Sequence, residues 1–173
     1  MHPKNLTIAL AGNPNSGKTT IFNIITGTRQ KVGNWPGVTV EKKEGRIHKF
    51  GHDLKVIDLP GTYSLTPYSI EEIVARNYIL DERPDVVVAM VDAAILERSL
   101  YLVAELLPLP SPVIVGLNMI DVARKRGIEV DAERLARELG CPVVPVVAVA
   151  GMSMLMESPI CLPMSRVSRS ASS

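Results

Sequence analysis

The chain has 173 residues, of which 46% are hydrophobic and 21% charged, and these values are typical of one globular domain with a sizeable core. Its formal net charge of +1 gives no support for a nucleic-acid partner or a strongly acidic one. Two cysteines, Cys141 and Cys161, are too few for a disulfide framework or a cysteine metal site. No apolar run reaches the roughly 18 residues of a membrane-spanning helix, and the N-terminus lacks the apolar core of a signal peptide.

Strands and helices are predicted to alternate along the chain. Apolar runs predict strands at 5–11, 54–59, 85–91, 113–117 and 142–147, and a weak alternation predicts an edge strand at 40–50. Helices are predicted from 20, over 69–80, 95–107 and 120–125, and from 130 to 140. Residues 27–39 and 60–68 are rich in glycine, proline and threonine and are predicted to be long loops. The pattern predicts an α/β fold with a mostly parallel six-stranded sheet, one antiparallel edge strand and helices on both faces.

The end of the chain differs from the rest. Residues 151–173 contain three closely spaced methionines, two prolines and a serine-rich terminus, with no helical stripe. We expect one folded domain over residues 1–150 and a poorly ordered or altered tail over 151–173.

A phosphate-binding loop is predicted directly after the first strand. The segment from Gly12 to Thr19 fits G-x-x-x-x-G-K-[ST] and lies between a strand and a helix, the context that this motif requires. The two glycines let backbone N–H groups approach phosphate oxygens, whereas Lys18 is expected to reach the β- and γ-phosphates and Thr19 to ligate Mg²⁺. The alternative is a chance glycine-rich turn. The predicted nucleotide-binding residues of this segment are Gly12, Asn13, Pro14, Asn15, Ser16, Gly17, Lys18, Thr19 and Thr20.

Two further motifs follow strands and extend this site. Asp58 and Gly61 form a D-x-x-G motif, in which Asp58 can hold Mg²⁺ through a water and Gly61 can offer a backbone N–H to the γ-phosphate. Asn118, Met119 and Asp121 form the N-x-x-D variant of a guanine-reading motif. The Asp121 carboxylate can accept hydrogen bonds from guanine that adenine does not offer, so GTP is favoured over ATP. The alternatives are an ordinary strand-to-loop turn at Asp58 and a helix cap at Asp121.

A threonine of the first long loop is a candidate second Mg²⁺ ligand. Thr28 and Thr39 compete for this role, and Thr39 is better placed because it directly precedes the next strand. A loop that closes on GTP through this threonine and relaxes after hydrolysis would be an order–disorder switch.

Taken together, these motifs resemble those of Ras-like and TRAFAC-type P-loop GTPases. Residues 32–41, 58–65, 69–72 and 118–121 resemble the N-terminal G domain of the ferrous iron transporter B family, with V-G-N-W-P-G-V-T as the most specific stretch. The resemblance covers about residues 5–148. It implies a GTPase with slow intrinsic turnover on the cytoplasmic face of the membrane. It also implies helical and transmembrane partner domains, which we do not expect in this otherwise soluble piece, and allows a dimer of G domains.

The resemblance also implies roles for single residues. Asn15 matches an asparagine that marks potassium-stimulated GTPases, and Thr62 stands where Ras-like proteins have a water-orienting glutamine. The implied catalytic residues are Asn15, Lys18, Thr39 and Gly61; the implied metal ligands are Thr19, Thr39 and Asp58 for Mg²⁺ and Asn15 for K⁺.

The segment after the last predicted strand departs from the family pattern. Where the family has a Ser-Ala pair after the last strand, this chain has Val147 and Ala148, and Val147 could still offer a backbone N–H to guanine. Glu97 and Arg98 are expected on a solvated helix face.

Two other functions remain open from the sequence. The first is a GTPase for ribosome assembly or tRNA modification, which shares the Asn15 signature. The second is a nucleotide-dependent binding module with negligible turnover, favoured by the missing glutamine.

Overall fold

The computed structural model describes residues 5–27, 30–49 and 51–146. Within these residues one sheet has the strand order β2-β3-β4-β1-β5-β6-β7. The strand β1 pairs in parallel with β4 and β5, β5 with β6 and β6 with β7, whereas β3 is antiparallel to both β2 and β4. The strands are β1 (Asn5–Gly12), β2 (Gln30–Asn34), β3 (Glu41–Lys49), β4 (His52–Asp58), β5 (Val86–Asp92), β6 (Val113–Asn118) and β7 (Val143–Pro145).

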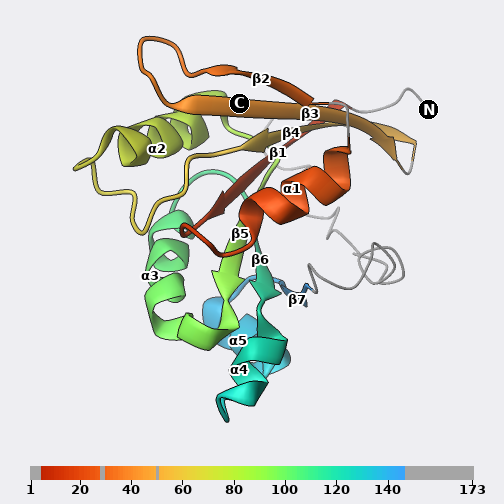
Figure 1. Ribbon diagram of the computed structural model, residues 1–173, viewed down its shortest axis with the longest axis vertical. Coiled ribbons are helices and arrows are strands. Elements are labelled where there is room, and N and C mark those ends of the chain that lie inside the picture. Colours follow the sequence, from red (N-terminus) through yellow and green to blue (C-terminus); the bar gives the residue numbers. More distant parts are fainter. Residues whose placement is uncertain (1–4, 28–29, 50, 147–173) are drawn as a thin grey trace, which may run out of the picture.

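Helices cover the two faces of the sheet unequally (Figure 1). Buried residues of α2, α3 and α4 pack with one set of strand side chains that includes Ala9, Ala11 and Ile57. Phe22 and Ile21 of α1 pack on the opposite face, against alternate residues of the same strands. The helices are α1 (Lys18–Thr26), α2 (Ile70–Glu82), the short 3₁₀ turn η1 (Ala93–Ile95), α3 (Leu96–Leu106), α4 (Ile120–Lys125) and α5 (Ala132–Leu139).

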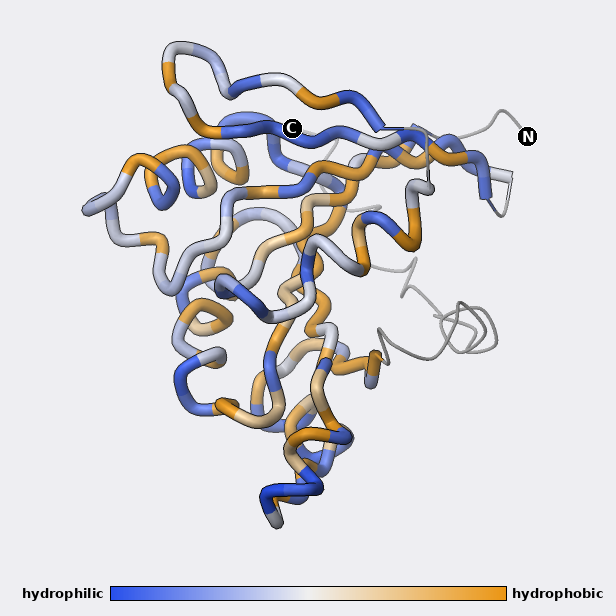
Figure 2. Tube along the Cα trace, viewed as in Figure 1, coloured by the Kyte–Doolittle hydropathy of each residue, from blue (hydrophilic) through white to orange (hydrophobic). Residues whose placement is uncertain are grey.

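Central strands of the sheet are more hydrophobic than strands near its edge. Figure 2 shows that apolar residues dominate β5 and β6, whereas β3 is mostly hydrophilic. A parallel strand that is covered on both faces becomes almost continuously apolar, and a strand near the edge does not. The apolar runs therefore predicted the central strands well, and the boundaries of α2 and α4 also agree closely with the sequence-based expectation.

The sheet differs from the expectation at one edge. The α/β fold is confirmed, but among the described residues the sheet has seven strands instead of six, because part of the predicted loop 27–39 forms β2. This strand pairs antiparallel with β3 from Gln30 opposite Gly45 to Asn34 opposite Glu41. Four of its five residues are exposed, so it has no apolar pattern that could reveal it in the sequence.

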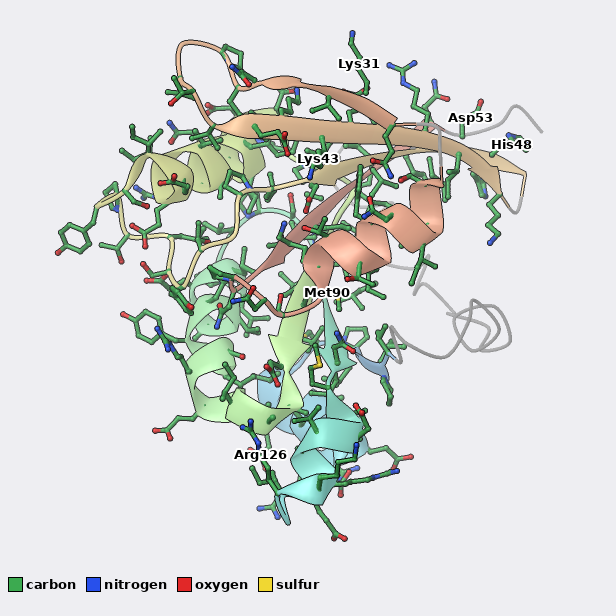
Figure 3. All side chains as sticks on the ribbon, viewed as in Figure 1. Lys31, Lys43, His48, Asp53, Met90 and Arg126 are labelled. Atoms are coloured by element: carbon green, nitrogen blue, oxygen red, sulfur yellow. The ribbon has the colours of Figure 1, made fainter. Side chains whose placement is uncertain are left out.

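Close packing on the α1 face depends on two glycines. Met90 extends from β5 across the neighbouring strand β6 (Figure 3), and a Cβ at Gly116 would lie 2.8 Å from its sulfur. A Cβ at Gly45 of β3 would lie 2.2 Å from Cγ2 of Thr26, at the end of α1. Gly45 thus lets the C-terminal end of α1 lie close to β3, and Gly116 leaves room for the Met90 side chain. Over the described part of the chain, no helix combines the length and apolar character needed to cross a bilayer.

Candidate functional site

Three loops with the predicted motifs meet at one edge of the sheet. They follow β1, β4 and β6, which run parallel, so their carboxyl ends lie together (Figure 1). Ligands of open α/β sheets bind at this edge. The strand order also places β1 between β4 and β5, near the centre of the group.

The loop after β1 has an unusual backbone. Asn15 and Gly17 both have positive φ values, 65° and 86°, and the Ser16 N–H donates to the Asn13 carbonyl at 3.1 Å. The loop then passes into α1 through Gly17, without a side-chain cap at the helix N-terminus. A curled loop before an uncapped helix presents free N–H groups to an anion.

Buried polar atoms in this loop have no partner in the described structure. Asn13 is 2% exposed and Ser16 is 1% exposed, yet both side-chain amide atoms of Asn13 and the Ser16 hydroxyl lack a hydrogen bond. Buried polar groups without partners are rare and require an explanation. Their position in the loop is consistent with a site whose polar ligand completes the hydrogen bonding.

Lys18 and Asp58 face each other in the middle of the site. The Lys18 ammonium pairs with the Asp58 carboxylate and donates to the Leu59 carbonyl at 2.6 Å, and both side chains are only 8% exposed. The sequence predicted both residues at the phosphates and the metal, but the structure shows them bound to each other.

The N-x-x-D loop contacts the phosphate-binding loop directly. Asn118, at the end of β6 and 3% exposed, donates through Nδ2 to the Ser16 carbonyl at 3.0 Å. A Cβ at Gly17 would lie 2.2 Å from the same Nδ2 atom, so only glycine permits this approach. Met119 adopts a positive φ of 58° before α4, and Asp121 in the first turn of that helix is exposed to solvent. The two loops thus form one continuous surface.

The loop after β4 lies against the loop after β1. The Leu59 N–H donates to the Leu10 carbonyl at 3.0 Å, and the Thr62 N–H donates to the Gly12 carbonyl at 3.2 Å. Between them, a Cβ at Gly61 would lie 3.4 Å from Cα of Pro14, in contact. The segment 59–62 is therefore fixed beside the phosphate-binding loop.

Thr39 lies in the turn that connects β2 and β3 and is exposed. The turn is held by hydrogen bonds from the Trp35 N–H to the Val40 carbonyl, 2.9 Å, and from the Val38 N–H to the Trp35 carbonyl, 3.3 Å. Trp35 itself is 7% exposed and packs edge-on against Tyr78 of α2, with 5.3 Å between the ring centroids. The structure thus gives Thr39 no contact with Lys18 or Asp58 among the interactions of the described residues.

The other predicted residues fall into two groups. Pro14, Asn15, Thr19 and Thr20 are exposed along the loop and the start of α1, where solvent and a ligand have access. Thr28, Val147 and Ala148 lie outside the described residues, as does the predicted tail 151–173.

Sequence reasoning missed the side chains that hold the loop after β4. The Ser64 hydroxyl donates to Glu72 of α2 at 2.9 Å, and the Thr66 hydroxyl donates to Glu105 of α3 at 3.1 Å. The hydrogen bond from Ser64 is the largest cause of a lowered pKa of Glu72; burial opposes it, and hydrogen bonds from the cap residue Ser69 add to the lowering. The capping box of Ser69 and Glu72 was predicted and is confirmed, but the contacts with α3 join residues about forty positions apart and leave no local signal.

No group of three or more His, Cys, Asp or Glu side chains that could hold a metal ion occurs within residues 5–27, 30–49 and 51–146.

Comparisons with known proteins agree with this geometry. A family model described as ferrous iron transport protein B matches residues 6–157. The Fe(2+) transporter FeoB of Salmonella typhimurium strain LT2 is 53% identical over 152 residues, which are 86% of this chain and 20% of that protein; the Escherichia coli K12 protein gives the same values. The chain thus spans about a fifth of the curated relatives that it matches.

Solved structures extend the agreement to the fold. The G domain of the T. maritima FeoB iron transporter is 48% identical with a TM-score of 0.79, over 85% of this chain and 90% of that one. An S. thermophilus NFeoB mutant bound to GDP is 50% identical with a TM-score of 0.80, over 86% and 58%. The chain therefore belongs to the ferrous iron transport protein B (FeoB) family and comprises its N-terminal G domain.

Proposed function

We propose that this domain binds guanine nucleotides and slowly hydrolyses GTP, as the switch domain of a ferrous iron transporter. The observation that carries the proposal is the hydrogen bond from Asn118 to the Ser16 carbonyl, because it joins the base-reading motif to the phosphate-binding loop. The orphaned polar atoms of Asn13 and Ser16 support a polar ligand at the same place. The related S. thermophilus protein was solved with GDP bound, which supports a guanine nucleotide.

The phosphate end of the ligand is assigned to the loop after β1. Its backbone N–H groups and the Lys18 ammonium would bind phosphate oxygens, after Lys18 leaves the Asp58 carboxylate. The guanine end is assigned to the residues that follow β6 and β7. The proposed nucleotide-binding residues are Gly12, Asn13, Pro14, Asn15, Ser16, Gly17, Lys18, Thr19, Thr20, Asp58, Gly61, Asn118, Met119, Asp121, Val147 and Ala148.

The donor set fits Mg²⁺. Asp58 offers a buried carboxylate oxygen, and Thr19 offers an exposed hydroxyl one residue after Lys18; hard oxygen donors of this kind suit the ion. Thr39 is proposed as a further ligand once the β2–β3 turn moves. A bound Mg²⁺ supplies positive charge that offsets the phosphates.

K⁺ is proposed at Asn15. Its exposed side chain on a left-handed residue of the loop is free to face the nucleotide. This assignment depends on the family resemblance more than on geometry, and a salt substitution tests it directly.

Slow turnover is expected because the loop after β4 has no water-orienting glutamine at position 62. Thr62 has a short hydroxyl side chain where a glutamine would supply a long amide, and it is 5% exposed, with its backbone N–H bonded to the Gly12 carbonyl. Orientation of water would then depend on backbone groups near Gly61, with Lys18 stabilising phosphate charge.

The test is a comparison of binding and turnover. We expect GTP and GDP to displace a fluorescent GDP analogue and ATP to fail, and we expect single-turnover phosphate release to be faster in KCl than in NaCl. Equal competition by ATP would refute the guanine assignment, and equal rates in the two salts would refute the K⁺ assignment. No phosphate release at all would reduce the domain to a binding module.

The setting of the domain is also a proposal. We infer a G domain over residues 1–150 that works on the cytoplasmic face of the membrane together with helical and transmembrane parts of a transporter. The curated relatives, of which the matched region covers 20%, are described as Fe(2+) transporters and support this setting. A dimer of G domains is a further proposed arrangement, which light scattering with a GTP analogue would detect.

A further inference from the structure

The helix α3 holds the loop between β4 and α2 at two points. The Glu105 carboxylate accepts hydrogen bonds from the Leu65 N–H and from the Thr66 hydroxyl, the latter at 3.1 Å. The Arg98 guanidinium carbon lies over the Tyr63 ring, 4.0 Å from its centroid. Figure 1 shows α3 directly beside this loop. We call these contacts between α3 and the loop (Arg98 with Tyr63, Glu105 with residues 65–66) the α3 clasp.

Both contacts are made by the same face of α3. Arg98 and Glu105 are separated by about two helical turns, so their side chains leave the same face of the helix. A carboxylate that accepts two hydrogen bonds is a strong anchor, and a guanidinium over an aromatic ring adds a second attraction of a different kind. Tyr63, Leu65 and Thr66 therefore have fixed partners on α3.

The adjacent residues 59–62 are held by the end of β1, on the side of the loop away from α3. Leu59 and Thr62 donate their backbone N–H groups to the Leu10 and Gly12 carbonyls. Gly61, the proposed γ-phosphate contact, lies between these bonds and two residues before Tyr63, where the clasp begins. Only one peptide bond separates the Thr62 anchor from the residue stacked under Arg98, so the backbone near Gly61 is restrained from both directions.

We propose that Arg98 and Glu105 are positioning residues for GTP hydrolysis, which hold the backbone of Gly61 and Thr62 through the loop. This inference rests on the proposed function, and it gives a role to Arg98, which the sequence places on a solvated helix face. Neither side chain contacts the phosphate-binding loop in the described interactions. Loss of the clasp should therefore leave nucleotide affinity unchanged and slow only the step that requires an ordered loop.

The first test measures the clasp without nucleotide. We expect Glu105→Ala to accelerate amide hydrogen exchange at Leu65, whose N–H loses its acceptor, while exchange in β1 and β5 stays unchanged. Glu97→Ala is the matched control, because Glu97 is an exposed glutamate on the same helix. Unchanged exchange at residues 65–66 in Glu105→Ala would show that the clasp does not exist in solution.

The second test measures its role in turnover. We expect Arg98→Ala and Glu105→Ala to lower the single-turnover GTP hydrolysis rate by about ten-fold, with GDP affinity within about two-fold of the unmodified domain. Arg98→Lys keeps a cation over Tyr63 and should restore most of the rate. Arg98 is exposed, so its replacement does not endanger the core.

The outcomes separate this inference from the function on which it depends. If the unmodified domain releases no phosphate, the proposed hydrolysis is wrong whatever the clasp does. If it hydrolyses GTP and both alanine variants match its rate, the positioning role is wrong. A parallel loss of GDP affinity and rate would also overturn the role, since it would indicate general damage to the site.

Discussion

Lys18 and Asp58 form a buried ion pair at the centre of the nucleotide site. The ammonium is bonded to this carboxylate and to the Leu59 carbonyl, and both side chains are 8% exposed. The residue proposed to bind phosphate is thus neutralised by the residue proposed to bind Mg²⁺. On these proposed assignments, nucleotide and metal would have to separate the pair before either residue took its role, and their binding would be coupled.

This pair predicts the behaviour of Asp58→Asn. The variant leaves a buried ammonium without a charged partner, which costs about 3 kcal/mol when a buried pair is broken from one side. A phosphate would relieve that penalty. In EDTA we therefore expect a lower melting temperature for the variant but a larger rise on adding GDP than in the unmodified domain. An equal rise in both proteins would show that the ion pair does not compete with phosphate.

Gly17→Ala tests the contact between the two motif loops. Gly17 has a φ of 86°, and its Cβ would lie 2.2 Å from Nδ2 of Asn118, so alanine should break the bond from Asn118 to the Ser16 carbonyl. Gly37→Ala is the control, because Gly37 has a similar φ of 75° but nothing within 4 Å of its Cβ position. Both variants carry backbone strain of about 1 kcal/mol, and only Gly17→Ala should lose nucleotide binding, measured with a fluorescent GDP analogue.

Trp35 gives a built-in signal for movement of Thr39. It is the only tryptophan of the chain, it packs on Tyr78, and its backbone closes the turn that contains Thr39. If Thr39 moves to the metal, this turn must open. We expect a GTP analogue with Mg²⁺ to change tryptophan emission, GDP to change it much less, and Thr39→Ala to abolish the difference. Thr39→Ser, which keeps the hydroxyl, should restore it.

The Tyr78 phenol predicts a loss of stability in strong base. Burial, and then the negative charges of Glu82 and Glu44, raise the pKa of Tyr78 to about 12. The folded protein keeps this proton above pH 10, where the unfolded chain releases it. The stabilising contribution is therefore complete below pH 10 and disappears as the pH rises through 12, a change of about 2–3 kcal/mol.

Tyr78→Phe removes this titration and serves as the reference. We expect chemical denaturation to show the unmodified domain losing stability relative to Tyr78→Phe between pH 10 and pH 12, with a constant difference at lower pH. A constant difference across the whole range would contradict the raised pKa.

The sequence by itself determined the fold class and the motif residues. Central strands such as β5 are buried on both faces, so their apolar runs are continuous and easily recognised. The phosphate-binding loop has a local signature because its backbone geometry requires glycine at positions such as Gly17. The capping box of Ser69 and Glu72 spans only four residues and was equally visible.

The tertiary structure alone decided the pairings between distant residues. The strand β2 is polar and exposed, so only its hydrogen bonds with β3 make it a strand. The contacts from Lys18 to Asp58, from Asn118 to Ser16 and from Glu105 to Thr66 join residues 40, 102 and 39 positions apart. The sequence shows which secondary structure each residue favours. Which distant residue it contacts depends on how the strands and helices pack, and the candidate nucleotide site is built from such contacts.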